Sequence, residues 1–508
     1  MSLPARLRAL SLEITVFVSG GLLMTYEIIG SRILAPFIGT STYVWTSLIG
    51  VILASLSLGY WFGGRLADKR PDIRILAAVL FLAGTLVSVT VLVKEIVLSF
   101  IASAPVGVEI RSLLTALLLF APASVCLGMV TPYAVKLRML NLADAGKTVG
   151  RLYALSTVGS IAGTFIAGFF LIPFVGSVRT LYIVAGSLIA LSLLLVPFAI
   201  SRLNIAGLVL LFSAVLWSEA AAGISFRANE LRDIDTEYSR VQVFRSTDGK
   251  GRAIRVLTTD PYAIQSAIFL DSDEPALEYG RFYHLARHFK PDFRDVLVIG
   301  GAGYSTPKEF LRRYENARLD VVEIDPRMTD IAREHFRLKD DARLNIIHED
   351  GRMYLNRANA GRYDVVLMDA FGSMFTVPFQ LTTVEAVKRI SDCLTDDGVV
   401  IFNLGSSITR AGSGFFRAEM ATYRSVFPHV FVFEVRPERA DETLQNLIIV
   451  ASKSNYLPQL TSSDAEISSL LANIYSSNIP IDMPILTDDL APVEHYNSIA
   501  QNQFSPPQ

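Results

Sequence analysis

Seven apolar stretches, each about 20 residues long and poor in charge, recur within the first 222 residues of the chain. A bilayer core needs about 20 apolar residues per helix, and lipid tolerates only helices or closed barrels as spanning structures. A cleaved signal peptide would explain the first stretch alone. The sequence therefore predicts a helical, polytopic membrane domain over residues 1–222, with spans near residues 12–31, 43–63, 75–93, 112–131, 153–172, 178–198 and 203–221.

The charge balance separates this N-terminal region from the rest of the chain. Residues 1–222 contain 15 Lys/Arg and 8 Asp/Glu, whereas the remainder contains 31 basic and 40 acidic residues. An acidic C-terminal half offers no basic stripe for phosphates, which argues against a nucleic-acid partner. The two cysteines, Cys126 and Cys393, stand far apart and indicate neither a disulfide framework nor a zinc site, and the sequence shows no other metal-ligand cluster.

Three details of the apolar region have more than one interpretation. The Gly59-xxx-Gly63 and Gly159-xxx-Gly163 motifs favour close packing of helices over a role in transport. An acid at membrane depth is costly, so Glu27 marks either a functional site or an ion pair with Arg32. Residues 96–110 form either a re-entrant piece or an extension of the third helix.

After residue 222 the composition becomes polar and strand signals appear. "YSRVQVFRS" and "RAIRVLTT" flank "TDGKG", a strong hairpin signal, and with "AIQSAIFLD" they predict a small β-domain within residues 223–272. From residue 273 to 508, strands alternate with helical patterns, which indicates an α/β domain with a mostly parallel sheet covered on both faces. A class I methyltransferase-like (Rossmann-like) sheet is expected, with the last two strands antiparallel and with strands near residues 295–299, 319–324, 344–348, 364–368, 398–403, 429–434 and 446–451.

Glycines and acids follow the first three of these strands. Three glycines end the first strand in "VLVIGGAGY", where a Rossmann-type fold binds its ligand. Glu323 ends the second strand, 20 residues after Gly303, where an acid commonly accepts hydrogen bonds from ribose hydroxyls. Asp350 in "HEDGRMYL" ends the third strand and is placed to accept from an adenine amino group. The sequence thus predicts an adenosine-type site at Gly300, Gly301, Gly303, Glu323, Asp350 and Gly351.

The fourth predicted strand ends at Asp369 in "YDVVLMDAFGS". A carboxylate in this place faces the reactive end of a bound ligand, and the alternative is that it caps the following turn. Gln265 in "YAIQSAIF" is either structural or part of the pocket. His284 and His288 precede the first strand and are interpreted as ordinary surface or core residues.

The order of these motifs resembles the spermidine synthase family, the polyamine aminopropyltransferases. The segments "AIQ", "DSDEPALEYGRFYHLARH", "VLVIGGAGY", "VVEIDP", "HEDGRMYL" and "YDVVLMDAF" follow the order of that family over about residues 235–455. The stretches "SRILAPFIGTSTYVWTSLIGVILASLSLGYWFGGRLADKR" and "GRLYALSTVGSIAGTFIAGFFLIPFVG" are similar to the membrane domain of bacterial membrane-integrated spermidine synthase-like proteins.

This resemblance implies a donor and roles for individual residues. The donor would be decarboxylated S-adenosylmethionine or S-adenosylmethionine, and the acceptor an amine or a lipophilic molecule. Glu323 would hold the ribose, Asp350 the adenine amine, and Gln265 the sulfur-side end of the donor. Asp369 would position and deprotonate the attacking amine. On the acceptor side, the resemblance assigns Glu278 and Tyr283 to substrate binding.

The substrate half of the predicted pocket departs from the family pattern, whereas the nucleoside half keeps it. Gly303 stands where the Gly-Gly-Gly-Asp-Gly loop of the family has the acid that contacts the aminopropyl ammonium. Gly372 replaces the second acid of an Asp-Ser-Ser-Asp motif, and Leu277 with Glu278 replaces a Tyr-Gln pair. These departures argue against putrescine as the acceptor. Near the C-terminus, "PILTDDLAPVEHY" resembles a signature of the membrane-fused subgroup, and its acids, Asp488 and Asp489, either reach the active site or, as favoured, cap a helix that starts near Pro492.

The sequence as a whole predicts a membrane-anchored transferase that moves an aminopropyl or other alkyl group to an amine. The alternatives are a transporter or sensor whose soluble domain binds a nucleoside or polyamine without turnover, and a membrane scaffold with a degenerate enzyme domain. Basic loops at 63–74 and 136–151 are expected in the cytoplasm. With these loops on the cytoplasmic side, seven membrane crossings would place the catalytic domain on the outer side of the membrane. We expect that domain in the cytoplasm, where the sulfonium donor is made, with the chain in the bacterial inner membrane. Soluble relatives commonly form dimers, so a homodimer is a further expectation.

Overall fold

The computed structural model describes residues 5–503 except residues 39–40, 103, 105, 140–143, 197–229, 260–263, 273, 372–377 and 410. The predicted span at 203–221 and Gly372 therefore lie outside the described residues. The chain divides into two compact units, a helical unit of residues 1–228 with 234–239 and a sheet unit of residues 229–233 with 240–508. Strands β2 (Arg240–Thr247), β3 (Ala253–Thr258) and β4 (Ser266–Phe269) thus belong to the same unit as the α/β domain predicted from residue 273.

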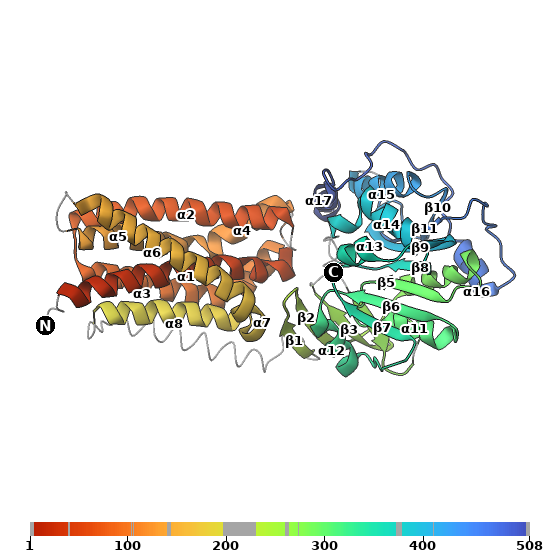
Figure 1. The fold of residues 1–508 in the computed structure, drawn as a ribbon, viewed down its shortest axis with the longest axis horizontal. Helices are drawn as coiled ribbons and strands as arrows, with labels where there is room; N and C mark the ends of the chain where they lie inside the picture. The colour runs from red at the N-terminus through yellow and green to blue at the C-terminus, as the bar shows by residue number, and fades with distance from the viewer. Residues whose placement is uncertain are drawn as a thin grey trace. The chain divides into compact units, whose positions relative to one another are not determined.

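Helices make up the described part of the helical unit (Figure 1): α1 (Ala5–Ile38), α2 (Thr42–Lys69), α3 (Ile73–Ala102), α4 (Val108–Leu119), α5 (Ala121–Arg138), α6 (Ala145–Ile166) with η2 (Ala167–Leu171), α7 (Ile172–Val175) and α8 (Ser177–Leu195). Within the described residues, five helical segments are long and apolar enough to cross a membrane. The pair α4 and α5, bent by 55°, adds a sixth if it forms one span. The first six predicted stretches are confirmed as helices, and residues 96–102 extend the third.

Glycines allow two pairs of these helices to meet at backbone distance. A Cβ on Gly163 of α6 would lie 2.1 Å from the carbonyl oxygen of Gly21 on α1. Between α2 and α5, a Cβ on Gly59 would lie 2.3 Å from the carbonyl oxygen of Val125. Side chains at these positions would separate the helices, so both predicted small-residue motifs are confirmed as packing seams.

Glu27 lies half-buried on α1. Within the described part of the chain, its carboxylate forms no ion pair with Arg32, the partner considered from the sequence. Ion pairing to that arginine therefore does not account for an acid in this apolar helix, and the functional interpretation of Glu27 stays a prediction.

A small antiparallel sheet begins the sheet unit, with the strand order β1-β2-β3-β4. Its strands are β1 (Glu230–Asp235), β2 (Arg240–Thr247), β3 (Ala253–Thr258) and β4 (Ser266–Phe269). The predicted hairpin is confirmed, since the Asp248 amide donates to the Arg252 carbonyl at 2.9 Å and Gly251 turns the chain with a φ of 79°. Strand β1 was not predicted, because only two of its six residues, Leu231 and Ile234, are apolar.

The large sheet has seven strands in the order β10-β11-β9-β8-β5-β6-β7 (Figure 1). Strand β11 runs antiparallel to both of its neighbours, β9 and β10, while the pairs from β9 to β7 are parallel. This is the arrangement of a class I methyltransferase-like sheet and confirms that prediction. The strands are β5 (Asp295–Ile299), β6 (Arg318–Glu323), β7 (Leu344–His348), β8 (Tyr363–Met368), β9 (Leu394–Ser406), β10 (His429–Glu434) and β11 (Gln445–Ser452).

Helices cover this sheet and connect its parallel strands. They are η3 (Glu278–Leu285), α10 (Ala286–Phe289), α11 (Ser305–Arg313), α12 (Pro326–His335), α13 (Gly351–Arg357), η4 (Phe379–Leu381), α14 (Val384–Cys393), η5 (Ala411–Ser413), α15 (Gly414–Arg424), α16 (Ala465–Leu471) and α17 (Val493–Gln503). Burial on both faces explains why the central strands consist of continuous apolar runs.

Strand register places the functional residues at one edge of the sheet. Ile299 of β5 lies opposite Val322 of β6 and Met368 of β8. The residues that follow these strands therefore emerge together, because the carboxyl ends of parallel strands meet at the same edge. The predicted glycines, Glu323, Asp350 and Asp369 all leave the sheet there.

The glycine seams generate a first prediction. Gly163→Val should place side-chain atoms inside the α1–α6 contact, and overpacking of this kind costs about 1–3 kcal/mol. Thermal unfolding of the detergent-purified chain should then begin several degrees lower. Gly186→Val is the matched control, because a Cβ on Gly186 of α8 meets no atom of the described residues within 4 Å. Equal melting temperatures for the two variants would contradict the seam.

Candidate active site

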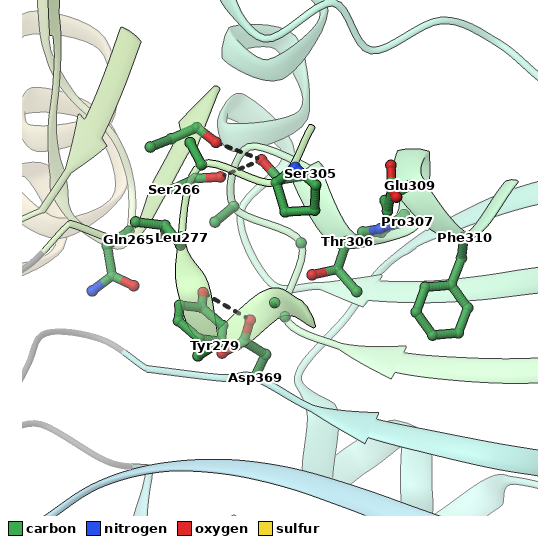
Figure 2. A pocket seen from close by; sticks show the side chains of 17 residues that line it. Gln265, Ser266, Leu277, Tyr279, Ser305, Thr306, Pro307, Glu309, Phe310 and Asp369 are labelled. Atoms are coloured by element: carbon green, nitrogen blue, oxygen red, sulfur yellow. Dashed lines mark hydrogen bonds between the residues drawn. The ribbon is translucent and has the colours of Figure 1, made fainter. Parts of the chain in front are cut away.

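A cavity open to solvent lies at the carboxyl edge of the large sheet, with about 650 Å³ of empty volume (Figure 2). Its wall comes from the end of β5, the end of β8, strand β4, η3 and the start of α11. Among the residues predicted from sequence, the lining includes Gln265, Gly300, Gly301 and Asp369. The other predicted residues that the structure describes lie outside this lining, namely Gly303, Glu323, Asp350, Gly351, Glu278 and Tyr283.

The glycine turn after β5 requires its first glycine. Gly300 has a φ of +100°, and a Cβ there would lie 2.3 Å from the carbonyl oxygen of Asp369. Ala302 and Tyr304 also have left-handed backbones, with φ of 43° and 54°, which is costly for residues with a side chain. Tyr304 is fully buried and shares a hydrogen bond with Thr329 at 2.7 Å. This anchor holds the turn in its conformation.

Glu323 fastens the same turn from the end of β6. Its Oε2 accepts hydrogen bonds from the amides of Gly301 at 2.9 Å and Ala302 at 3.0 Å, and its Oε1 accepts from the Asp325 amide at 2.9 Å. The side chain is 7% exposed, and burial raises its pKa against the effect of these amides. A carboxylate has about four acceptor positions, so one remains for a ligand hydroxyl.

Asp350 is the N-cap of α13. Its Oδ1 accepts from the Met353 amide at 3.0 Å, and Gln380 donates to its Oδ2 over a longer 3.5 Å. Gly351 begins the helix against the sheet, where a Cβ would lie 2.8 Å from Ile299. The capping role leaves Oδ2 as the oxygen with acceptor capacity for a ligand.

Asp369 follows β8 directly, and donors hold both of its carboxylate oxygens. Tyr279 donates to Oδ2 at 3.2 Å (Figure 2), and the side-chain amide of Asn403 donates to Oδ1 at 3.0 Å. Neither partner was identified from the sequence. Asn403 had a usable signal, because it is the single polar residue inside the buried run "VVIFNL" of β9, and a buried amide needs partners.

The surroundings of Asp369 tune its charge. Burial raises the pKa of Asp369 to about 6, and the hydrogen bonds from Asn403 and Tyr279 oppose that rise. Burial, followed by the nearby Asp369 charge, raises the pKa of Tyr279 and of Tyr283 well above the usual range. Tyr283 is fully buried with its ring edge-on to Tyr279, at a centroid distance of 6.1 Å. The wall thus places an acid that is ionised at neutral pH beside two neutral phenols.

Glu278 and Gly303, from the substrate half of the predicted pocket, take positions that the sequence did not indicate. Glu278 is exposed and pairs with Arg436 at 2.6 Å, outside the cavity lining. A Cβ on Gly303 would lie 2.5 Å from Ser266 Oγ, and Ser266 shares a hydrogen bond with Ser305 at 2.9 Å. An acid at position 303 would not fit this arrangement, which gives a physical reason for the departure from the family loop.

The helix-cap interpretation of Asp488 is wrong. Arg352 of α13 pairs with its Oδ2 at 2.6 Å, and the Thr383 hydroxyl at the start of α14 donates to Oδ1 at 2.6 Å. The ion pair with Arg352 lowers the pKa of Asp488. Asp488 therefore ties α13 to α14 and lies outside the cavity lining, as does Asp489. The predicted helix is present and begins at Val493.

The two histidines belong to the packing of the domain. His284 is buried, stacks on Phe310 and shares a hydrogen bond with the Tyr314 hydroxyl at 2.8 Å. Burial lowers its pKa to about 3, so the ring is neutral. His288 bonds to the Gln459 carbonyl at 2.6 Å. Among the described residues, no group of three His, Cys, Asp or Glu side chains gathers to hold a metal ion.

Comparison with known proteins identifies relatives of this geometry. The spermine/spermidine synthase domain matches residues 280–454. A polyamine aminopropyltransferase of Vibrio vulnificus is 27% identical over 263 residues, covering 51% of this chain and 84% of the relative. Polyamine aminopropyltransferase 2 of Ralstonia nicotianae is 25% identical and covers 78% of each chain, more than the sheet unit alone supplies, so that similarity extends into the helical unit.

Solved structures of similar proteins align with about half of the chain. A probable spermidine synthase from Corynebacterium glutamicum gives a TM-score of 0.41 at 22% identity, covering 54% of this chain and 95% of the other. The spermidine synthase of Thermotoga maritima gives a TM-score of 0.37 at 19% identity, covering 48% and 84%.

The hydrogen bonds of Glu323 generate a second prediction. In Glu323→Gln one oxygen becomes an NH2 group, so at least one of the three backbone amides loses its acceptor, at a cost of about 1–3 kcal/mol. The glycine turn should become more sensitive to limited proteolysis, and the melting temperature should fall. Glu334→Gln is the control, because Glu334 is an exposed residue of α12 paired with Arg232, and it should change neither quantity. A turn equally protected in both variants would contradict this role.

Proposed function

We propose that this chain, whose C-terminal domain belongs to the spermine/spermidine synthase family, is a membrane-anchored transferase that moves an aminopropyl or other alkyl group onto an amine. The donor is decarboxylated S-adenosylmethionine or S-adenosylmethionine. The observation that carries the proposal is Asp369, an acid with a pKa of about 6 that lines the cavity beside the glycine turn and is fixed by two donors.

The nucleoside part of the donor is proposed to bind over the glycine turn. Gly300 and Gly301 line the cavity without side chains, which lets a ligand approach the backbone closely. The remaining acceptor position of Glu323 is assigned to a ribose hydroxyl, and Oδ2 of Asp350 to the adenine amino group. Gln265 lines the cavity and is assigned to the sulfur end of the donor.

Asp369 is proposed to prepare the amine for attack. An alkylamine has a pKa near ~10 and is protonated at neutral pH, whereas only the neutral nitrogen attacks carbon. The ionised Asp369 docks the ammonium and accepts its proton, which then passes to water. The nitrogen forms a bond to the carbon next to the sulfonium, the carbon–sulfur bond breaks, and its electron pair leaves with sulfur as a neutral thioether. Holding both partners in line supplies much of the rate.

The cavity wall supports an acceptor with an apolar body. Pro275, Ala276 and Leu277 line the cavity together with Asp369. Gly303 brings no acid to the donor tail, and Glu278 is paired with Arg436 on the surface. We therefore favour a lipophilic amine over putrescine as the acceptor. Tyr283 is proposed to contribute to acceptor binding indirectly, through its contact with Tyr279.

The helical unit is proposed to anchor the enzyme in the bacterial inner membrane, with the sheet unit in the cytoplasm. Five apolar helical segments of spanning length, and a sixth counting the bent pair, support the anchor within the described residues. The basic loops that flank these helices support a cytoplasmic location for both loops. A homodimer stays a prediction, and the mass of the purified chain in detergent tests it.

The first experiment on function is calorimetric titration of the purified chain with S-adenosylmethionine, its decarboxylated form and methylthioadenosine, followed by turnover with a series of amines. We expect binding of a sulfonium donor and transfer to an amine. Asp369→Asn should keep donor binding within a few-fold but lower kcat about 100-fold or more. Binding without turnover in the wild type would favour a sensor or transporter, and absence of binding by all three compounds would overturn the proposal.

The raised pKa of Asp369 predicts the acid limb of the pH profile. Because this acid must be ionised to accept a proton, and its pKa is about 6, kcat should fall as the pH decreases through about 6. The affinity for the donor, measured without amine, should not fall over the same pH range. A wild-type profile that stays level down to about pH 5, a full unit below that pKa, would rule out Asp369 as the base.

A further inference from the structure

A chain of three polar side chains crosses the sheet next to the proposed site. Asn446 on β11 donates its side-chain amide to Oδ1 of Asn403 on β9 at 2.9 Å. The amide of Asn403 in turn donates to Oδ1 of Asp369 at 3.0 Å. Asn403 is 3% exposed, and Asn446 is half-buried and lies outside the cavity lining.

Strand register explains how these three residues meet. Met368 lies opposite Phe402 in the parallel pair β8–β9, so the next residues along, Asp369 and Asn403, are neighbours. In the antiparallel pair β9–β11, Asn403 lies opposite Ile448. Asn446, two residues away from Ile448, is on the same face as Asn403 and within diagonal reach.

The hydrogen bond from Asn446 determines how Asn403 is oriented. An asparagine side chain presents an oxygen at one end and an NH2 group at the other. When Asn446 donates to the oxygen of Asn403, the NH2 group is left pointing at Asp369. Without Asn446, a buried carbonyl would lose its donor, a state that proteins avoid, and Asn403 would be free to turn away from the acid. Donation at one end also strengthens donation at the other.

We propose that Asn446 is a positioning residue for the transfer reaction, acting through Asn403 to hold Asp369 in its ionised, correctly aimed form. This inference rests on the proposed function for its effect on rate, but not for its effect on Asp369 itself. Among the described residues, the titratable groups that face Asp369 are Tyr279 and Tyr283, both from η3. In the part of the chain that the structure describes, neither tyrosine is hydrogen-bonded to Asn446, so a change at position 446 reaches the acid through Asn403.

The test compares full-length wild type with Asn446→Leu, which removes the donor at similar volume, and Asn446→Gln, which keeps an amide. Infrared titration follows the protonated-carboxyl band that disappears in Asp369→Asn, so it measures Asp369 without any substrate. We expect a midpoint at about 6 in the wild type, and a rise of roughly 0.5 pH units or more in Asn446→Leu, since the ionised form loses a donor. Asn446→Gln should shift less.

Turnover provides the second readout. In Asn446→Leu, kcat should fall about 10-fold while the KM for the donor changes by less than about twofold, and the acid limb of the pH profile should move with the infrared midpoint. The control is Asn345→Leu on β7, which removes the amide bond to Asp320 at 2.9 Å at the far edge of the sheet. It should lower stability without shifting the midpoint.

These two readouts separate the positioning role of Asn446 from the transferase activity. A shifted midpoint in a chain that transfers nothing would refute the transferase and keep the positioning role. A transferase whose Asn446→Leu variant titrates like the wild type would overturn the positioning role. That role is also overturned if Asn446→Leu only loses stability, as Asn345→Leu is expected to do.

Discussion

The close approach of Gly300 to the backbone of Asp369 is the constraint on which the site depends. Two parallel strands, β5 and β8, lie side by side, and the chain must leave both at the same edge. At Gly300 there is no space for a Cβ, so the turn lies directly against the residue that carries the acid. This approach brings the glycine turn and the buried carboxylate into a single wall.

The polar groups around this wall have two functions at once. Glu323 satisfies three backbone amides of the turn and still has an acceptor position. Asp350 caps a helix with one oxygen and keeps the other. Asp369 differs, because its partners are side chains, and burial brings its pKa close to neutral pH. Structural bonds therefore hold the proposed binding acids in place, while the proposed base keeps a charge that can change during a reaction cycle.

Much of the sheet unit was predictable because the relevant patterns are local. The buried strands are short apolar runs separated by helical periods, and the acids stand at their ends, so the strands and Asp369 were placed correctly from sequence. Contacts across strands were not predictable in the same way. The bond between Asn403 and Asp369 depends on register. The ion pair between Asp488 and Arg352 depends on how the segment before α17 packs against α13. Strand β1 was not predicted from the sequence, because its charged sequence lacks an apolar run.

The insertion of β11 between β9 and β10 has a consequence for biosynthesis. The strands that bring Asp369, Asn403 and Asn446 together are β8, β9 and β11, which together extend from Tyr363 to Ser452. A ribosome makes the apolar helices first, and these are complete long before the last of the three strands appears. A nascent chain therefore carries its apolar helices well before it carries a finished carboxylate network, so under the proposed function the growing polypeptide would enter the bilayer before it could catalyse transfer.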